Sequence, residues 1–120
     1  KARRELLVGA HVDPVFGPVV VIGDGGKYVE AMPDSTLLLP PFDSGDVRKA
    51  LSRLRVAPLL AGVRGDPALD VEAYCRAVVA VGNLMTAPDS RIESLDVNPV
   101  AVGAAGEGCR ALDAVVFERT

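Results

Sequence analysis

The sequence has 120 residues, of which 49% are hydrophobic and 24% charged, and its formal net charge is −3. This length suits one domain, so we expect residues 1–120 to form a single domain, and the initial Lys1 suggests that it is excised from a longer chain. Basic residues do not cluster beyond residues 1–4, and apolar runs fall short of the roughly 18–20 residues that span a bilayer. We therefore expect neither nucleic-acid nor membrane partners. We expect a cytoplasmic location.

The first third of the chain is strand-like. Continuous or β-branched apolar runs predict strands at residues 5–12, 19–22 and 28–32. Asp13–Pro14 predicts a turn after the first strand, and the glycine loop at residues 23–26 predicts a tight reversal after the second.

The middle of the chain predicts two helices. Ser44 is a candidate N-cap for a helix of about three turns, whose apolar positions Val47, Ala50, Leu51 and Leu54 share one face. Residues 58–65 follow as a linker. Asp70 is the expected cap of a longer helix over residues 71–86, with buried positions at Ala73, Ala77, Val78, Val81, Leu84 and Met85.

The last third returns to strands: one at residues 91–97 that continues at residues 101–102, and a last one at residues 110–117, after a turn at residues 103–108. Pro99 is expected to interrupt the pairing within this region. Strands and helices are thus grouped rather than alternating. We therefore predict an α+β fold with a largely antiparallel sheet covered by two helices.

Asp96 and Asn98 form the most informative pair of polar residues. They are two positions apart on a predicted strand, so they point to one face while Leu95 and Val97 point to the other. A turn centred between Ala105 and Gly106 would place Asp113 opposite Asn98. A carboxylate and an amide oxygen are ligands that Mg²⁺ accepts. The alternative is a solvated strand edge before a proline turn.

The segments DVNPV (residues 96–100) and ALDA (residues 111–114) resemble the acid–x–Asn–Pro–hydrophobic motif and the later aspartate of ATP-grasp ligases of the succinyl-CoA synthetase type. Other segments resemble ADP-forming acetyl-CoA synthetases in the same order, at residues 5–9, 13–20, 23–26, 29–30, 39–41, 58–60 and 62–65. The similarity covers residues 5–117. It implies the C-terminal lobe of an ATP-grasp fold.

The resemblance implies a role for each of the three polar residues. Asn98 and Asp113 match the positions that hold Mg²⁺ on the phosphates of ATP or ADP, and Asp96 matches an acid close to the metal and to a phosphorylated histidine. The implied reaction joins an acid to coenzyme A at the expense of ATP, through that phosphohistidine. Other domains would bind coenzyme A and the acyl substrate and would carry the histidine.

The glycine loop and one arginine are further candidates for nucleotide binding. Gly23, Gly25 and Gly26 would let backbone N–H groups approach a phosphate, although a plain hairpin turn explains the same glycines. Arg64 matches a family position and is either a phosphate or structural partner or an ordinary surface residue.

Two residues depart from the family pattern. Ser94 stands where a glutamate is usual, and Leu38 stands where an arginine is usual. The motifs of the other ATP-grasp lobe do not occur, so the chain is expected to hold half a site and to bind Mg-ATP weakly or not at all alone. The alternative is a degenerate regulatory or interaction module, for example one attached to a protein lysine acyltransferase.

Overall fold

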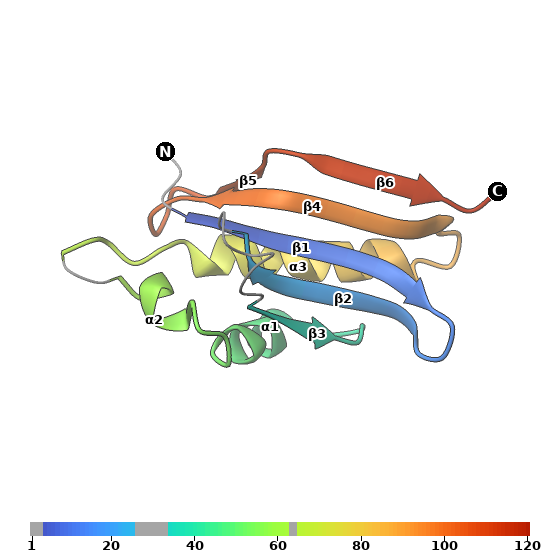
Figure 1. The fold of residues 1–120 in the computed structure, drawn as a ribbon, viewed down its shortest axis with the longest axis horizontal. Coiled ribbons are helices and arrows are strands. Elements are labelled where there is room, and N and C mark those ends of the chain that lie inside the picture. The colour runs from blue at the N-terminus through green and yellow to red at the C-terminus, as the bar shows by residue number, and fades with distance from the viewer. Residues whose placement is uncertain (1–3, 26–33, 63–64) are drawn as a thin grey trace.

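The computed structural model describes residues 4–25, 34–62 and 65–120. In this part of the chain, an antiparallel sheet is combined with helices (Figure 1). The strands are β1 (Arg4–Asp13), β2 (Gly17–Asp24), β3 (Ser35–Leu38), β4 (Ile92–Val102), β5 (Cys109–Ala111) and β6 (Ala114–Glu118). The helices are α1 (Ser44–Leu51), α2 (Ala57–Leu60) and α3 (Val71–Thr86). The predicted third strand at residues 28–32 lies outside the described residues.

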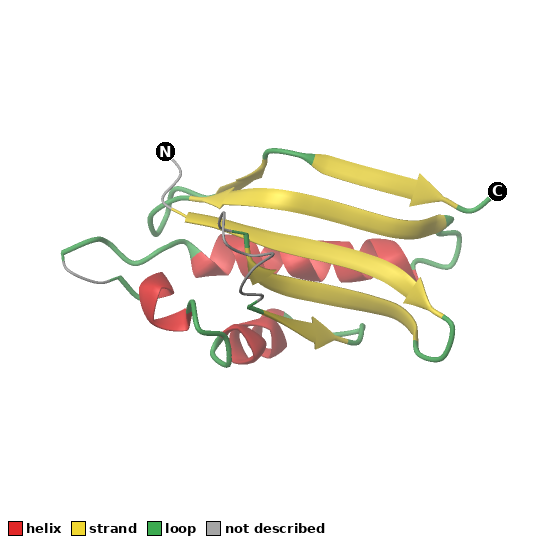
Figure 2. Cartoon of the chain, viewed as in Figure 1, coloured by secondary structure: helices red, strands yellow, loops and turns green. Residues whose placement is uncertain are grey.

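The six-stranded sheet has the order β3-β2-β1-β4-β5, and β6 also pairs with β4. Helices α1 and α3 pack against one face of the sheet, and among the described residues no helix packs against the other face, which we call the uncovered face (Figure 2). The core lies between α1, α3 and the covered face, and its most deeply buried side chains include Tyr74, Leu6, Ile22, Val8 and Val78. The predicted α+β class with an antiparallel sheet is confirmed.

Helix α3 has the bounds that the sequence predicts. The Asp70 carboxylate caps it by accepting a hydrogen bond from the Ala73 N–H at 3.1 Å, and the helix ends at Thr86, before Pro88. Most of the predicted apolar face is buried. Ala77 and Leu84 are the exceptions, because Ala77 is only partly buried and Leu84 is 51% exposed.

The region between β3 and α3 differs from expectation in two places. The N-cap of α1 is Asp43 rather than Ser44, because Asp43 and Asp46 form a reciprocal capping box. This helix ends at Leu51, although Leu54 is still buried. The expected linker contains the short helix α2, which has a proline in its first turn and buries Leu60.

Strand β4 is continuous through Pro99, where an interruption of its pairing was expected. A β-bulge accommodates Pro99: Val8 pairs with Val97 and Leu6 with Val100, so Asn98 and Pro99 both lie opposite one residue of β1. The predicted final strand is broken instead, into β5 and β6. Within the described residues, no helix is long and apolar enough to cross a membrane.

Candidate functional site

The hairpin that follows the bulge places Asp113 opposite Asn98. The pairs Val102–Cys109, Val100–Ala111 and Val97–Ala114 have the constant sum of residue numbers that the predicted turn requires. The Asn98 N–H donates a hydrogen bond to the Asp113 carbonyl oxygen at 3.0 Å, and the Leu112 N–H donates to the Pro99 carbonyl oxygen at 3.0 Å. The predicted register is therefore confirmed.

Asp96 lies on the uncovered face of the sheet. Its neighbour Leu95 is buried on the helix side, and Asp96 itself is exposed and pairs with Gly9 of β1. A Cβ atom added at Gly9 would lie 3.4 Å from Asp96 Oδ1, so the glycine leaves space for this carboxylate. Asp96 is therefore held beside the central strand of the sheet and remains accessible.

The oxygen ligands on this hairpin fit a hard cation that is bound only in part by the protein and takes its remaining ligands from a substrate or water. Asn98 supplies an amide oxygen and Asp113 a carboxylate, both exposed, and oxygen ligands of this kind suit Mg²⁺. Mg²⁺ is often held by one or two protein groups together with substrate phosphates. The described residues contain no group of three or more His, Cys, Asp or Glu able to enclose a metal alone. The pair is thus suited to a metal shared with a ligand.

A buried tyrosine supports the bulge from the helix side. Leu7 is the residue of β1 that lies opposite Asn98 and Pro99, and its carbonyl oxygen accepts a hydrogen bond from the Tyr74 hydroxyl of α3. Tyr74 is fully buried, and this burial raises the pKa of its hydroxyl far above the usual range. The hydroxyl therefore stays protonated and remains a donor to the bulge.

The predicted glycine loop begins later than expected. Gly23 lies inside β2, between its partners Leu7 and Ser35, and an added Cβ would lie 2.5 Å from the Asp34 carbonyl oxygen. At Gly25 an added Cβ would lie 2.8 Å from the Leu6 carbonyl oxygen. Close packing of the backbone therefore explains both glycines without a ligand. Gly26 and Arg64 lie outside the described residues.

Ser94, at which the sequence departs from the family pattern, lies on the uncovered face of the sheet, as Asp96 does. It pairs with His11 of β1 and with Phe117 of β6, and the three side chains line a shallow surface pocket. The sequence did not predict this juxtaposition, because it depends on the order of three strands. The position expected to carry an acid is therefore occupied by a small neutral residue next to an exposed imidazole.

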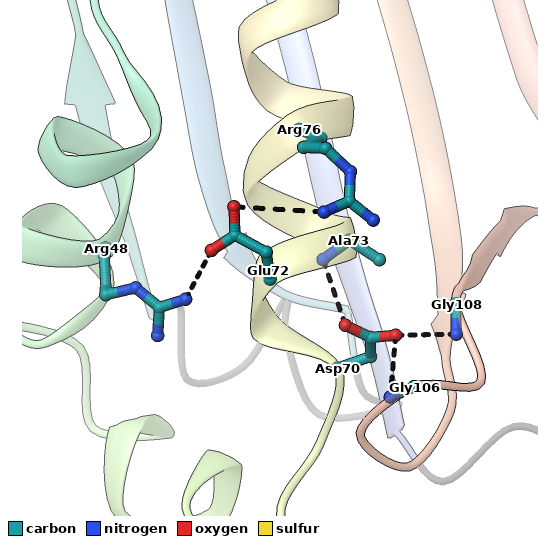
Figure 3. A network of polar contacts seen from close by, with 7 residues as sticks. All are labelled: Arg48, Asp70, Glu72, Ala73, Arg76, Gly106 and Gly108. Carbon is teal, nitrogen blue, oxygen red and sulfur yellow. Dashed lines mark hydrogen bonds and ion pairs between the residues drawn. The ribbon is translucent and has the colours of Figure 1, made fainter.

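Asp70 has more partners than the sequence predicted. Besides capping α3, its carboxylate accepts hydrogen bonds from the N–H groups of Gly108 at 2.7 Å and Gly106 at 3.1 Å (Figure 3). The bonds from Gly108, Ala73 and Gly106 hold the pKa of this carboxyl below its usual value. The capping pattern identified Asp70, but nothing in the sequence indicated the second contact, 36–38 residues away.

A family model for the ATP-grasp domain matches residues 1–117. Among curated proteins, the chain is 44% identical over 117 residues to a trans-feruloyl-CoA synthase of an unknown prokaryote, covering 98% of the chain and 16% of that protein. It is 36% identical over 117 residues to the β subunit of ADP-forming acetate–CoA ligase II of Pyrococcus furiosus. That match covers 98% of the chain and 50% of the subunit.

Solved structures agree with these matches. One is the dinucleotide-forming acetyl-coenzyme A synthetase 1 of Candidatus Korarchaeum cryptofilum, solved with coenzyme A and Mg-AMPPCP. It gives a TM-score of 0.89 at 30% identity, over 99% of this chain and 55% of that one. A protein of Pyrococcus horikoshii gives a TM-score of 0.91 at 32% identity, over 99% of this chain and 50% of that one.

The chain thus spans about half of these structures and of the P. furiosus subunit, and a smaller share of the longer relative. The order of its segments, its fold and its relatives all agree. The 120-residue chain belongs to the ATP-grasp domain family, in the branch whose relatives are ADP-forming acyl-CoA synthetases.

Proposed function

We propose that the chain is the nucleotide- and Mg²⁺-binding half-site of an ADP-forming acyl-CoA synthetase. The observation that carries the proposal is the register of the β4–β6 hairpin, which sets Asn98 opposite Asp113 beside the accessible carboxylate of Asp96. Relatives that bear the name ADP-forming acetate–CoA ligase support this assignment.

The overall reaction would convert an acid, coenzyme A and ATP into an acyl-CoA, ADP and phosphate, reversibly, through a phosphohistidine on another domain. Mg²⁺, when bound, would neutralise negative charge on the nucleotide phosphates. Asn98 and Asp113 would hold the ion. Asp96 would accept a hydrogen bond from the imidazole N–H of the visiting histidine and so orient its other nitrogen toward the phosphate.

The need for partners follows from the length of the relatives. The chain covers half of a P. furiosus subunit, and the Korarchaeum structure contains coenzyme A, Mg-AMPPCP and a phosphohistidine segment pointing towards the nucleotide site. We propose that the remaining ATP-grasp lobe and the coenzyme A-binding and phosphohistidine domains complete the site, within the same protein or complex. Nucleotide contacts by Gly23, Gly25, Gly26 and Arg64 stay predictions, as does a cytoplasmic location.

A degenerate regulatory or interaction module is the second candidate, and two observations favour it. Ser94 leaves the uncovered face without the acid that the family pattern expects there. Leu38, at the position of an expected arginine, packs against the core instead of offering a charge. Both departures remove charge from a site that would work by charge neutralisation.

Acyl-CoA formation by the full-length protein separates the two candidates. In an active synthetase, Asn98→Ala and Asp113→Ala should each lower kcat/KM by at least about tenfold and raise the Mg²⁺ concentration needed, because each removes a metal ligand. Asn83→Ala and Asp89→Ala are matched controls at exposed positions outside the hairpin and should leave both quantities unchanged.

Two results would contradict the proposed function. One is a measurable synthetase activity that survives both hairpin substitutions, since Asn98 and Asp113 would then not hold the metal. The other is micromolar binding of Mg-ATP to the 120-residue chain on calorimetric titration, since half a site should bind in the millimolar range or not detectably. Absence of synthetase activity in a full-length protein with all its domains would favour the degenerate module.

A further inference from the structure

Burial does not fix the register of strand β6. Among residues 105–118, all of which the structure describes, none is buried, and Val115, Val116 and Phe117 are 46–63% exposed. Register is strongly specified where one face of a strand is buried and weakly specified where both faces are exposed. The position of Asp113 opposite Asn98 therefore depends on the short ladder of β5 and on the turn that precedes it.

That turn, at residues 103–108, is attached to the start of α3 by the backbone. The Asp70 N–H donates to the Gly103 carbonyl oxygen at 2.9 Å, and the Ala105 N–H donates to the Ala68 carbonyl oxygen at 2.9 Å. These bonds flank an isolated bridge between Leu69 and Ala104. They hold the first half of the turn against a segment that is anchored by the core.

The second half of the turn is joined to α3 by the side chain of Asp70, in addition to bonds within the turn such as that from the Ala104 N–H to the Glu107 carboxylate at 3.0 Å. Asp70 Oδ2 accepts from Gly106 and Gly108, while Oδ1 of the same carboxylate accepts from Ala73 in the first turn of α3 (Figure 3). Gly106 and Gly108 both have positive φ angles, +87° and +82°, so the turn has a specific backbone conformation. One carboxylate thus joins the helix that covers the sheet to the residues that lead into β5.

We propose that Asp70 is a positioning residue for the Asn98–Asp113 pair, an inference that rests on the proposed function of that pair. Asp70 fixes the length and conformation of the turn, and the turn fixes which residue between β5 and β6 lies opposite Asn98. A slip of one residue would move the Asp113 side chain to the other face of the sheet, away from Asp96. Asp70 acts through the turn and does not itself contact the metal pair.

The test separates the link to the turn from the capping of the helix. In Asp70→Ser the shorter side chain still caps α3, because serine is as good an N-cap as aspartate, but it no longer reaches Gly106 and Gly108. Asp43→Ser is the matched control, since Asp43 caps α1 and its side chain is hydrogen-bonded to Asp46 of that helix instead of to the turn. Gly106→Ala strains the turn from its other side, where an added Cβ meets nothing within 4 Å.

Two quantities are measured on the full-length protein: amide hydrogen exchange, with Val8 as internal reference, and the Mg²⁺ concentration that half-saturates acyl-CoA formation. Asp70→Ser and Gly106→Ala should each speed exchange at the Asn98 and Leu112 amides by about tenfold, since hydrogen bonds to a charged group are lost or strained. Both should also raise the half-saturating Mg²⁺ concentration, and Asp43→Ser should change neither quantity.

Unchanged exchange at Asn98 and Leu112 in both variants would overturn the inference. Faster exchange with an unchanged Mg²⁺ requirement would overturn it as well, because the pairing would then not govern the site. If Asn98→Ala itself leaves the Mg²⁺ requirement unchanged, the proposed function fails, and the exchange data still decide whether Asp70 fixes the pairing. Should Asp70→Ser not fold, Gly106→Ala provides the same two readings.

Discussion

The centre of the sheet and its β5–β6 edge are stabilised in different ways. At the centre, β1 pairs with β2 and β4 and buries Leu6 and Val8 beneath the helices. At the edge, β6 pairs with β4 alone, and its side chains remain exposed. The candidate metal pair lies where the two regions meet, on the bulge of β4 and directly before β6. Stability and the candidate site therefore depend on different parts of one sheet, and substitutions should separate them.

The largest difference should appear between two leucines. Leu6 in β1 is 1% exposed, and Leu112 between β5 and β6 is 55% exposed. Leu6→Ala should lower the free energy of unfolding by about 2–5 kcal/mol, because it leaves a cavity in the core. Leu112→Ala should change the same quantity by no more than about 0.5 kcal/mol. Urea denaturation of the 120-residue chain measures both, and similar losses would mean that the edge is as tightly packed as the centre.

An intermediate effect is expected for the hydrogen bond that joins the core to the bulge. Tyr74→Phe removes the hydroxyl that donates to the Leu7 carbonyl oxygen, and should lower the free energy of unfolding by about 1–3 kcal/mol. It should also speed amide exchange at Asn98 more than at the residues of β2. A uniform change in exchange across the sheet would show that the bond supports the core in general and not the bulge.

The same tyrosine predicts a dependence on alkaline pH. Burial raises the pKa of Tyr74 in the folded chain above the usual value near 10. The contribution of its protonated hydroxyl to the free energy of unfolding is therefore fully present below pH 10 and is lost as pH rises above it. The unfolding free energy of the unsubstituted chain should therefore fall above about pH 10, and that of Tyr74→Phe should fall less. If the unfolding free energies of the unsubstituted chain and of Tyr74→Phe fell equally above pH 10, the alkaline dependence would not come from Tyr74.

A smaller effect is expected at acidic pH from the contact between α3 and the turn. Hydrogen bonds from the Gly108, Ala73 and Gly106 amides lower the pKa of Asp70 in the folded chain below the ordinary value of 3.8. The contribution of the carboxylate to the free energy of unfolding is therefore present above pH 3.8 and is lost as pH falls through the lower pKa of the folded chain. Asp70→Asn should therefore unfold with a weaker acid dependence than the unsubstituted chain. Asp89→Asn, which removes the same formal charge from a surface loop, should retain the full dependence.

The sequence predicted those features that local patterns determine. Helix α3 was predicted with its cap at Asp70 because apolar spacing, a capping residue and a terminating proline all agree there. The register that sets Asn98 opposite Asp113 was predictable because a hairpin register follows from the centre of its turn. The motif around Asn98 and the order of the other segments identified the family.

Long-range contacts were not predictable in the same way. The second contact of Asp70 and the placement of Ser94 between His11 and Phe117 both depend on which strands become neighbours. Gly23 was interpreted as a loop residue because a glycine-rich segment resembles a turn, whereas it lies within β2 at a close approach of two backbones. Ser44 was predicted to cap α1, whereas Asp43 does so, because its reciprocal capping box with Asp46 satisfies two N–H groups at once.

A titration with Mn²⁺, followed by NMR as paramagnetic broadening in the 120-residue chain with ADP present, examines the hairpin directly and tolerates weak binding. We expect broadening to begin at the Asn98 side-chain amide and at Asp113, to extend to Asp96, and to be lost in Asn98→Ala but not in Asn83→Ala. Broadening spread evenly over exposed carboxylates such as Asp43 and Asp89, or unchanged by Asn98→Ala, would contradict a metal site on this hairpin.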